Sequence, residues 1–179
     1  MLQIELPGIE LFNDATQEFM TVQPKPVQLE HSLISLSKWE ARWKKSFLAT
    51  SEKSREESVD YIRCMTLTQN LRPTDYAGVD QATIAKVNAY IDDPMTATTF
   101  TRRPGSVSRE IVTSELIYYW MIACSIPFEC QKWHLNRLMT LIQVCNAKDG
   151  PQKKMSKRDV LAQNRSINAI RRQKTGSRG

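Results

Sequence analysis

The sequence has few of the residues from which metal, disulfide and phosphate sites are usually built. In 179 residues there are two histidines, four cysteines and six glycines. The cysteines form no C-x-x-C pair, which argues against a structural zinc site and indicates reduced, buried thiols. The glycines are scattered, so no glycine-rich phosphate-binding loop is predicted. We expect neither a cofactor nor a bound metal.

Long hydrophobic runs are also missing. A membrane-spanning helix needs about 20 apolar residues, and the longest candidate, residues 111–128, contains Glu115 and is interrupted by Pro127. The first 12 residues include two glutamates and no basic region ahead of an apolar stretch, so no secretory signal is predicted. We therefore expect a cytoplasmic protein without a membrane partner.

The densest patch of reactive side chains is the stretch FECQKWHLNRLMTLIQVCN, residues 128–146. Cys130 and His134 are four residues apart, so on a helix they would share a face and could chelate a metal or form a nucleophilic pair. Further ligands do not follow, because Cys124 precedes a helix-breaking proline and Cys145 lies about three turns beyond His134. We predict the buried face of a helix, with His134 at the core edge bonded to backbone or water. No catalytic residue is predicted, and we do not expect an enzyme.

Positive charge is concentrated at the C-terminal end. Residues 148–179 hold ten Lys and Arg against two Asp and Glu, a balance of +8, whereas the chain as a whole carries +6. The remaining 147 residues therefore carry −2, and residues 1–36 are acidic. The basicity belongs to the tail and not to the body of the protein.

Residues 1–36 alternate apolar and polar side chains in short runs (LQIEL, IELFN, FMTV and PVQLEH) separated by turn residues. This pattern predicts short antiparallel strands. So small a sheet would be marginal alone, and it must pack on the helices or on another subunit.

The apolar period becomes helical from residue 37 onward. Capping-box spacing predicts helix starts at Ser37 and Ser54, and Asp80 predicts another. Two more helices are predicted over residues 109–125 and from Pro127 to about residue 146.

The predicted fold is mainly α, with about five core helices. Residues 1–36 would form a small, hairpin-like β element, residues 37–147 the helical core, and residues 148–179 a basic, partly helical tail.

Aromatic residues supply the candidate binding surface. Trp39 and Trp43 fall on one face of a helix, which usually indicates core. Tyr118, Tyr119 and Trp120 are consecutive and cover nearly a full turn, so they cannot all face one small core. At least one is expected to point outward, which favours a partner-binding face.

The tail supplies candidate electrostatic contacts, made by Lys153, Lys154, Lys157, Arg158, Arg171 and Arg172. Lysine and arginine neutralise phosphates whatever the base sequence. The tail lacks the interleaved aromatics that stack on bases, so specific nucleic-acid recognition is not expected. Homo-oligomerisation remains open.

Several blocks of the sequence resemble the tail assembly chaperones encoded among the virion assembly genes of tailed bacteriophages. The blocks are LEHSLISLSKWEARWKKSFL (29–48), YIDDPMTATTF (90–100), TSELIYYWMIACSIPFECQKWHLNRLMTLIQVCN (113–146) and SINAIRR (166–172). The resemblance implies a non-enzymatic protein of the host cytoplasm that keeps the long tape measure protein soluble and recruits tail-tube subunits. A groove formed by Tyr118–Trp120 with Trp39 and Trp43 would hold an apolar helix of the partner.

Two other classes remain open. A structural component of the virion, in the tail or at the head–tail junction, would add its acidic strands to a neighbouring sheet. A nucleic-acid-binding accessory protein would use the basic tail, and its affinity for DNA would fall steeply with salt.

Overall fold

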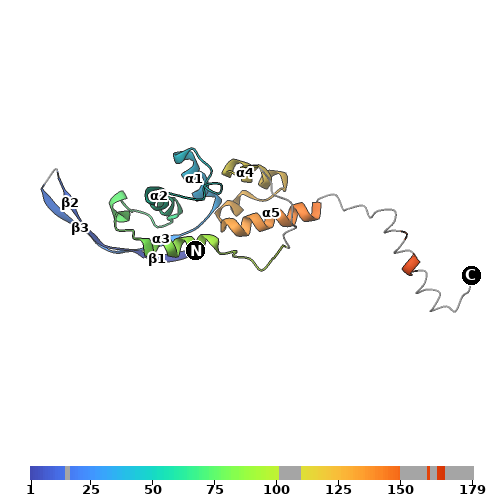
Figure 1. Cartoon of the computed structure of the whole chain (residues 1–179), viewed down its shortest axis with the longest axis horizontal. Helices are drawn as coiled ribbons and strands as arrows, with labels where there is room; N and C mark the ends of the chain where they lie inside the picture. The colour runs from blue at the N-terminus through green and yellow to red at the C-terminus, as the bar shows by residue number, and fades with distance from the viewer. Residues whose placement is uncertain (15–16, 101–109, 150–160, 162–164, 168–179) are drawn as a thin grey trace, which may run out of the picture. The chain divides into compact units, whose positions relative to one another are not determined.

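The computed structural model describes residues 1–14, 17–100, 110–149, 161 and 165–167. The chain divides into two compact units, residues 1–144 and 145–179 (Figure 1). Helices dominate, and the β element lies at the N-terminus, as predicted. The strands nevertheless make the chain a helix-rich mixed α/β protein and not a mainly α one.

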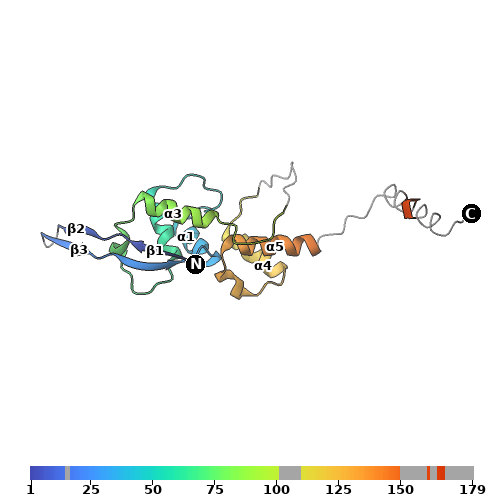
Figure 2. The same ribbon diagram turned by 90° about the horizontal axis from the view of Figure 1, so that it is seen from below.

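The N-terminal β element is one long hairpin interrupted halfway. Its strands are β1 (Leu2–Leu6), β2 (Ile9–Asn13), β3 (Glu18–Val22) and β4 (Lys25–Leu29). β1 pairs antiparallel with β4, and β2 pairs antiparallel with β3. In both views β2 and β3 extend beyond the helices, whereas β1 and β4 lie alongside them (Figures 1 and 2).

The inner half of the hairpin is packed on the helical core, as the marginal stability of a small sheet requires. Leu6, Val27 and Leu29 are fully or nearly fully buried. The backbone N–H of Glu30 donates to the carbonyl of Met65 at 2.9 Å, which joins the end of the hairpin to a helix end.

The described residues up to 149 contain five α-helices and two short 3₁₀ helices, and Leu161 and residues 165–167 are helical as well. The helices up to residue 149 are α1 (Leu33–Trp43), α2 (Arg55–Met65), η1 (Pro73–Tyr76), α3 (Gln81–Asp92), α4 (Ser114–Ala123), η2 (Phe128–Lys132) and α5 (Leu135–Asp149). Ser54 caps α2 and Asp80 caps α3, which confirms both predicted starts.

The predicted helix start at Ser37 is wrong. The N-cap of α1 is Ser32, whose hydroxyl accepts the N–H of Ser35, while the Ser35 hydroxyl accepts the N–H of Ser32 at 2.9 Å. Ser37 lies inside the helix. Glu40, which would complete the capping box with Ser37, instead accepts the N–H groups of Phe47 and Ser114.

The predicted continuous helix from Pro127 to about residue 146 is also wrong. The chain forms η2, becomes extended at Trp133, and begins α5 at Leu135. The N–H of Leu135 donates to the carbonyl of His31 at 2.7 Å, so a long-range contact fixes the start of α5. Cys130 and His134 therefore do not share a helical face.

The core is made of apolar side chains from the inner hairpin and from all five helices. Its largest fully buried members are Trp39, Tyr61, Leu6, Leu29, Leu33, Leu36, Ile62, Met65, Ile117, Met121, Leu135 and Leu138. No helix in the described part of the chain has the length and apolar content needed to cross a bilayer.

Candidate protein-binding surface

Helix α4 is apolar on its outer side as well as on its inner side. Its sequence, SELIYYWMIA, has a single charged residue. Ile117 and Met121 are one turn apart and fully buried, so they form the inner side. On the outer side Tyr119 is 64% exposed and Ile122 is 62% exposed. A surface helix normally carries charged and polar residues at such positions.

Two further aromatic rings extend this exposed area. Phe128, in η2, is 53% exposed, and its ring centroid lies 6.4 Å from that of the half-buried Tyr118. The Tyr118 hydroxyl donates to Gln131 Oε1 at 2.9 Å, which fixes the ring between α4 and η2. Helical spacing places Tyr118 and Tyr119 next to Ile122. We call Tyr118, Tyr119, Ile122 and Phe128 the α4 surface.

The position of α4 depends on a buried carboxylate from α1. Glu40 is 7% exposed. Its Oε2 accepts the N–H of Ser114, the first residue of α4, at 2.7 Å, and its Oε1 accepts the N–H of Phe47 at 3.0 Å. The carboxylate thus accepts a hydrogen bond from an N–H that has no partner within α4. Its negative charge also lies at the positive end of the helix dipole, which is favourable.

The local sequence also explains where α4 begins. Thr113 is the N-cap, and its hydroxyl accepts the N–H of Leu116 at 3.5 Å. The Ser46 hydroxyl donates to the carbonyl of Val112 at 2.6 Å, which ties the preceding residues to the loop after α1. The helix is therefore shorter than the predicted range of 109–125, and residues 101–109 lie outside the described part.

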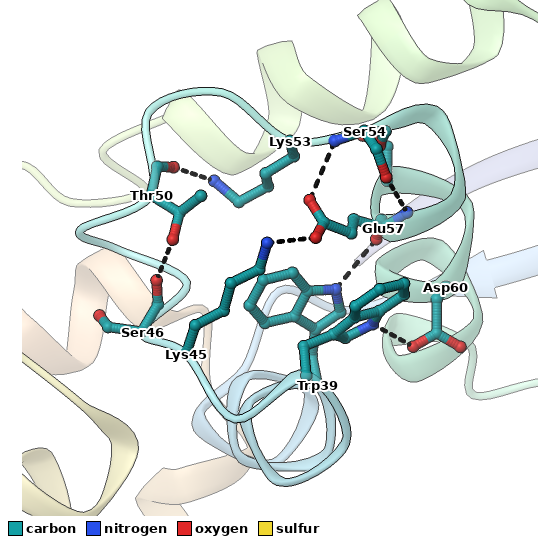
Figure 3. Close-up of polar contacts among 10 residues, drawn as sticks. Trp39, Lys45, Ser46, Thr50, Lys53, Ser54, Glu57 and Asp60 are labelled. Carbon is teal, nitrogen blue, oxygen red and sulfur yellow. Dashed lines mark hydrogen bonds and ion pairs between the residues drawn. The ribbon is translucent and has the colours of Figure 1, made fainter.

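The two tryptophans predicted to line the binding groove lie in a packed corner between α1 and α2. Figure 3 shows Trp39 in this corner. Trp39 is fully buried, and its indole N–H donates to the carbonyl of Glu57 at 2.9 Å. Trp43 is half-buried and donates to Asp60 Oδ2 at 3.0 Å. The prediction that Trp39 contacts a partner disagrees with its burial, and we leave both residues out of the α4 surface.

A lysine covers this corner from outside. The Lys45 ammonium lies 5.8 Å from the ring centroids of both Trp39 and Trp43 and forms an ion pair with Glu57 (Figure 3). This ion pair, followed by the N–H of Ser54, holds the pKa of Glu57 below its ordinary value. The corner is thus a closed structural cluster that fixes α1 against α2.

The other predicted contact residues divide into two groups. Trp120 is half-buried and lies beside Tyr119 on α4. The basic residues of the tail lie outside the described residues, and their contacts stay a prediction; they are Lys153, Lys154, Lys157, Arg158, Arg171 and Arg172.

Sequence reasoning missed that the two histidines lie together. His31 and His134 are both buried, and their ring centroids are 5.1 Å apart. His31 Nδ1 lies 2.6 Å from the hydroxyl of Tyr61, and His134 Nε2 lies 3.1 Å from the carbonyl of Tyr90. The prediction that His134 bonds to backbone is confirmed. No sequence signal pairs residues so far apart.

The histidine pair is suited to structure because burial keeps it neutral. Burial, followed by the neighbouring His134, lowers the pKa of His31 to about 3. Burial likewise lowers the pKa of His134. Neutral imidazoles of this kind bridge α1, α2, α3 and α5 by hydrogen bonds without placing a charge in the core.

No family model matches the chain, and no curated protein or solved structure shows detectable similarity to it. The resemblance to tail assembly chaperones therefore stays an expectation from the sequence.

Proposed function

We propose that this chain is a non-catalytic assembly protein of the tail assembly chaperone type, acting in the cytoplasm of a phage-infected host. Its partners would be the tape measure protein and tail-tube subunits, as the sequence resemblance implies. The observation that carries the proposal is the α4 surface, where Tyr119 and Ile122 are each more than 60% exposed on a firmly anchored helix.

The chemistry of the α4 surface fits an apolar stripe on a partner helix. A tape measure protein is long and helical, and its apolar stripes would aggregate if they stayed exposed. Tyrosine and phenylalanine supply large contact areas with little loss of side-chain entropy. Burying an exposed isoleucine or aromatic side chain on binding contributes about 1–2 kcal/mol, so Tyr119, Ile122 and Phe128 together support a reversible complex.

The experiment is co-expression with the tape measure protein encoded in the same genome. The tape measure carries the affinity tag, and the measurement is the amount that stays soluble and the amount of this chain that it retains. We expect Tyr119→Asp combined with Ile122→Asp to reduce retention about tenfold or more, because each carboxylate would have to be desolvated in an apolar contact.

The matched control is Leu67→Asp, since Leu67 is an exposed leucine (51%) on a different part of the structure. It should retain the tape measure as the wild type does. Circular dichroism and urea unfolding check that both variants fold. Retention of the tape measure by the Tyr119/Ile122 variant at the wild-type level would show that the α4 surface is not the binding site.

A second class, a structural virion component, is favoured by a separate observation. Strands β2 and β3 extend beyond the helices, and among the described strands each pairs only with the other. Such a ribbon can add to the sheet of a neighbouring subunit. Mass spectrometry of purified particles separates the two classes, because a chaperone leaves before the particle is complete and a structural component remains.

A further inference from the structure

The outer half of the hairpin exposes apolar side chains on both of its faces. We call residues 9–22 the arm. Phe12 and Phe19 are directly opposite each other, with ring centroids 5.1 Å apart, so they lie on one face. Leu11 and Met20 are the next opposite pair and lie on the other face. Packing between the two phenylalanines supports the hairpin, yet Phe19 stays 74% exposed and Phe12 47% exposed.

The charge of the arm has one sign. Residues 9–22 contain Glu10, Asp14 and Glu18 and no lysine, arginine or histidine. Glu10 and Glu18 are exposed. Two arms paired with each other would bring like charges together, which is unfavourable. The chemistry of the arm therefore suits a partner segment that is basic and also apolar.

The C-terminal segment of the same sequence has this chemistry. Residues 150–179 hold nine Lys and Arg against one acidic residue. Leu161 is 58% exposed and Ile167 is 40% exposed, and both lie in the described parts of this segment. Exposed apolar residues set among basic residues complement exposed apolar residues set among acidic ones.

α5, which leads into the C-terminal segment, starts at a fixed place within residues 1–144. The arm is the outer end of the hairpin, and the opposite end leads through His31 into α1. α5 begins at this opposite end, where Leu135 bonds to His31 and His134 bridges to Ser32. The C-terminal segment therefore follows a helix that starts at the end of the hairpin remote from the arm.

We propose that the arm of one copy binds the basic C-terminal segment of a second copy, so that molecules associate head to tail. The ligand of the arm is thus residues 150–179 of another molecule. Glu10 lies on the face of the two phenylalanines and Glu18 on the opposite face. Ion pairs from these two glutamates select the basic segment, and burial of Phe12 and Phe19 against its apolar residues supplies most of the affinity. Because every molecule carries both an arm and a segment, the contact can repeat, either reciprocally in a closed pair or along a series of molecules.

The test is sedimentation velocity of the full chain over a range of concentrations. We expect the wild type to associate, and to associate less at high salt because exposed ion pairs are screened. Glu10→Lys combined with Glu18→Lys should weaken association about tenfold. Glu52→Lys combined with Glu56→Lys changes two exposed glutamates outside the arm by the same charge, and it should leave association unchanged.

A charge swap identifies the ligand and its source. The variant Arg171→Glu with Arg172→Glu should likewise associate about tenfold more weakly by itself. Mixing it with the Glu10→Lys/Glu18→Lys variant should restore association, since the unchanged arm of one variant then meets the unchanged segment of the other, and the basic arm meets the two new glutamates. A monomeric wild type, an arm variant that associates normally, or a mixture that is not restored would each overturn the proposal.

This outcome is independent of the proposed chaperone function. The assay contains no tape measure protein, and Tyr119→Asp/Ile122→Asp should associate like the wild type because α4 is not part of the arm.

Discussion

The buried carboxylate of Glu40 holds the first turn of α4, and glutamine in its place would test that role with almost no change of shape. The carboxylate accepts two backbone N–H groups, from Phe47 at 3.0 Å and from Ser114 at 2.7 Å. Glutamine offers one carbonyl oxygen, so its amide NH₂ must face one of these donors. One N–H is then left buried without an acceptor.

The expected loss follows from these contacts. A hydrogen bond to a charged group contributes about 1.5–3 kcal/mol. The favourable position of the charge at the N-terminus of α4 adds about 0.3–1 kcal/mol. We therefore expect Glu40→Gln to lower the free energy of unfolding by about 2–4 kcal/mol, a large part of the roughly 5–15 kcal/mol of a typical domain. Glu40→Ala strands both N–H groups and should lower it further.

The measurement is urea unfolding followed by tryptophan fluorescence, combined with amide hydrogen exchange. Exchange should accelerate most at the amides of Ser114 and Phe47, because these lose their acceptors. Glu56→Gln is the control, since Glu56 is an exposed glutamate on α2, and it should change the stability by about 0.5 kcal/mol or less. If Glu40→Gln were as stable as Glu56→Gln, the carboxylate could not be what positions α4.

Two further predictions concern the core and the base of the arm. The unfolded chain protonates His31 below about pH 6.5, whereas the folded chain does so only near pH 3. The contribution of neutral His31 to the free energy of unfolding is therefore fully present well above pH 6.5. It is lost as the pH is lowered, by about 2 kcal/mol at pH 5. His31→Asn should reduce this difference between pH 7 and pH 5 in urea unfolding; an undiminished difference would assign the acid sensitivity to other groups. A Cβ on Gly78 would lie 2.5 Å from the carbonyl oxygen of Pro7, so Gly78→Ala should lower the melting temperature, with a loss of about 1–3 kcal/mol. A raised melting temperature, as at an unhindered glycine, would show that the backbone there moves freely.

The elements that could be predicted from sequence are those fixed by neighbouring residues. The alternation in residues 1–36 located all four strands, since each needs only its own pattern and the turn residues beside it. Ser54 and Asp80 were found as caps because their bonds close within three residues. Ser37 failed as a cap because Glu40 bonds to Ser114, and no local pattern reports a partner 74 residues away.

The candidate site was predicted only in part for the same reason. Three consecutive aromatics on a helix require one of them to face outward, and Tyr119 is the one that does. The other members of the α4 surface depend on the path of the chain after α4, where η2 brings Phe128 next to Tyr118. This path could not be predicted from the local sequence. Trp39 and Trp43 are four residues apart, a spacing that fits a binding groove as well as a core. In the structure their indole N–H groups donate to residues of α2.

The two exposed apolar elements share one physical feature, a buried carboxylate at the base. Glu40 holds the start of α4. Asp75 lies at the base of the arm and is 1% exposed. Its Oδ2 accepts a hydrogen bond from the Lys25 ammonium at 2.8 Å, and this contact lowers the pKa of Asp75. An exposed apolar surface that is held rigidly loses less conformational entropy on binding than a mobile one. Breaking either anchor should therefore weaken association at the surface it supports even when the exposed side chains are unchanged, and Glu40→Gln and Asp75→Asn allow the two surfaces to be tested separately.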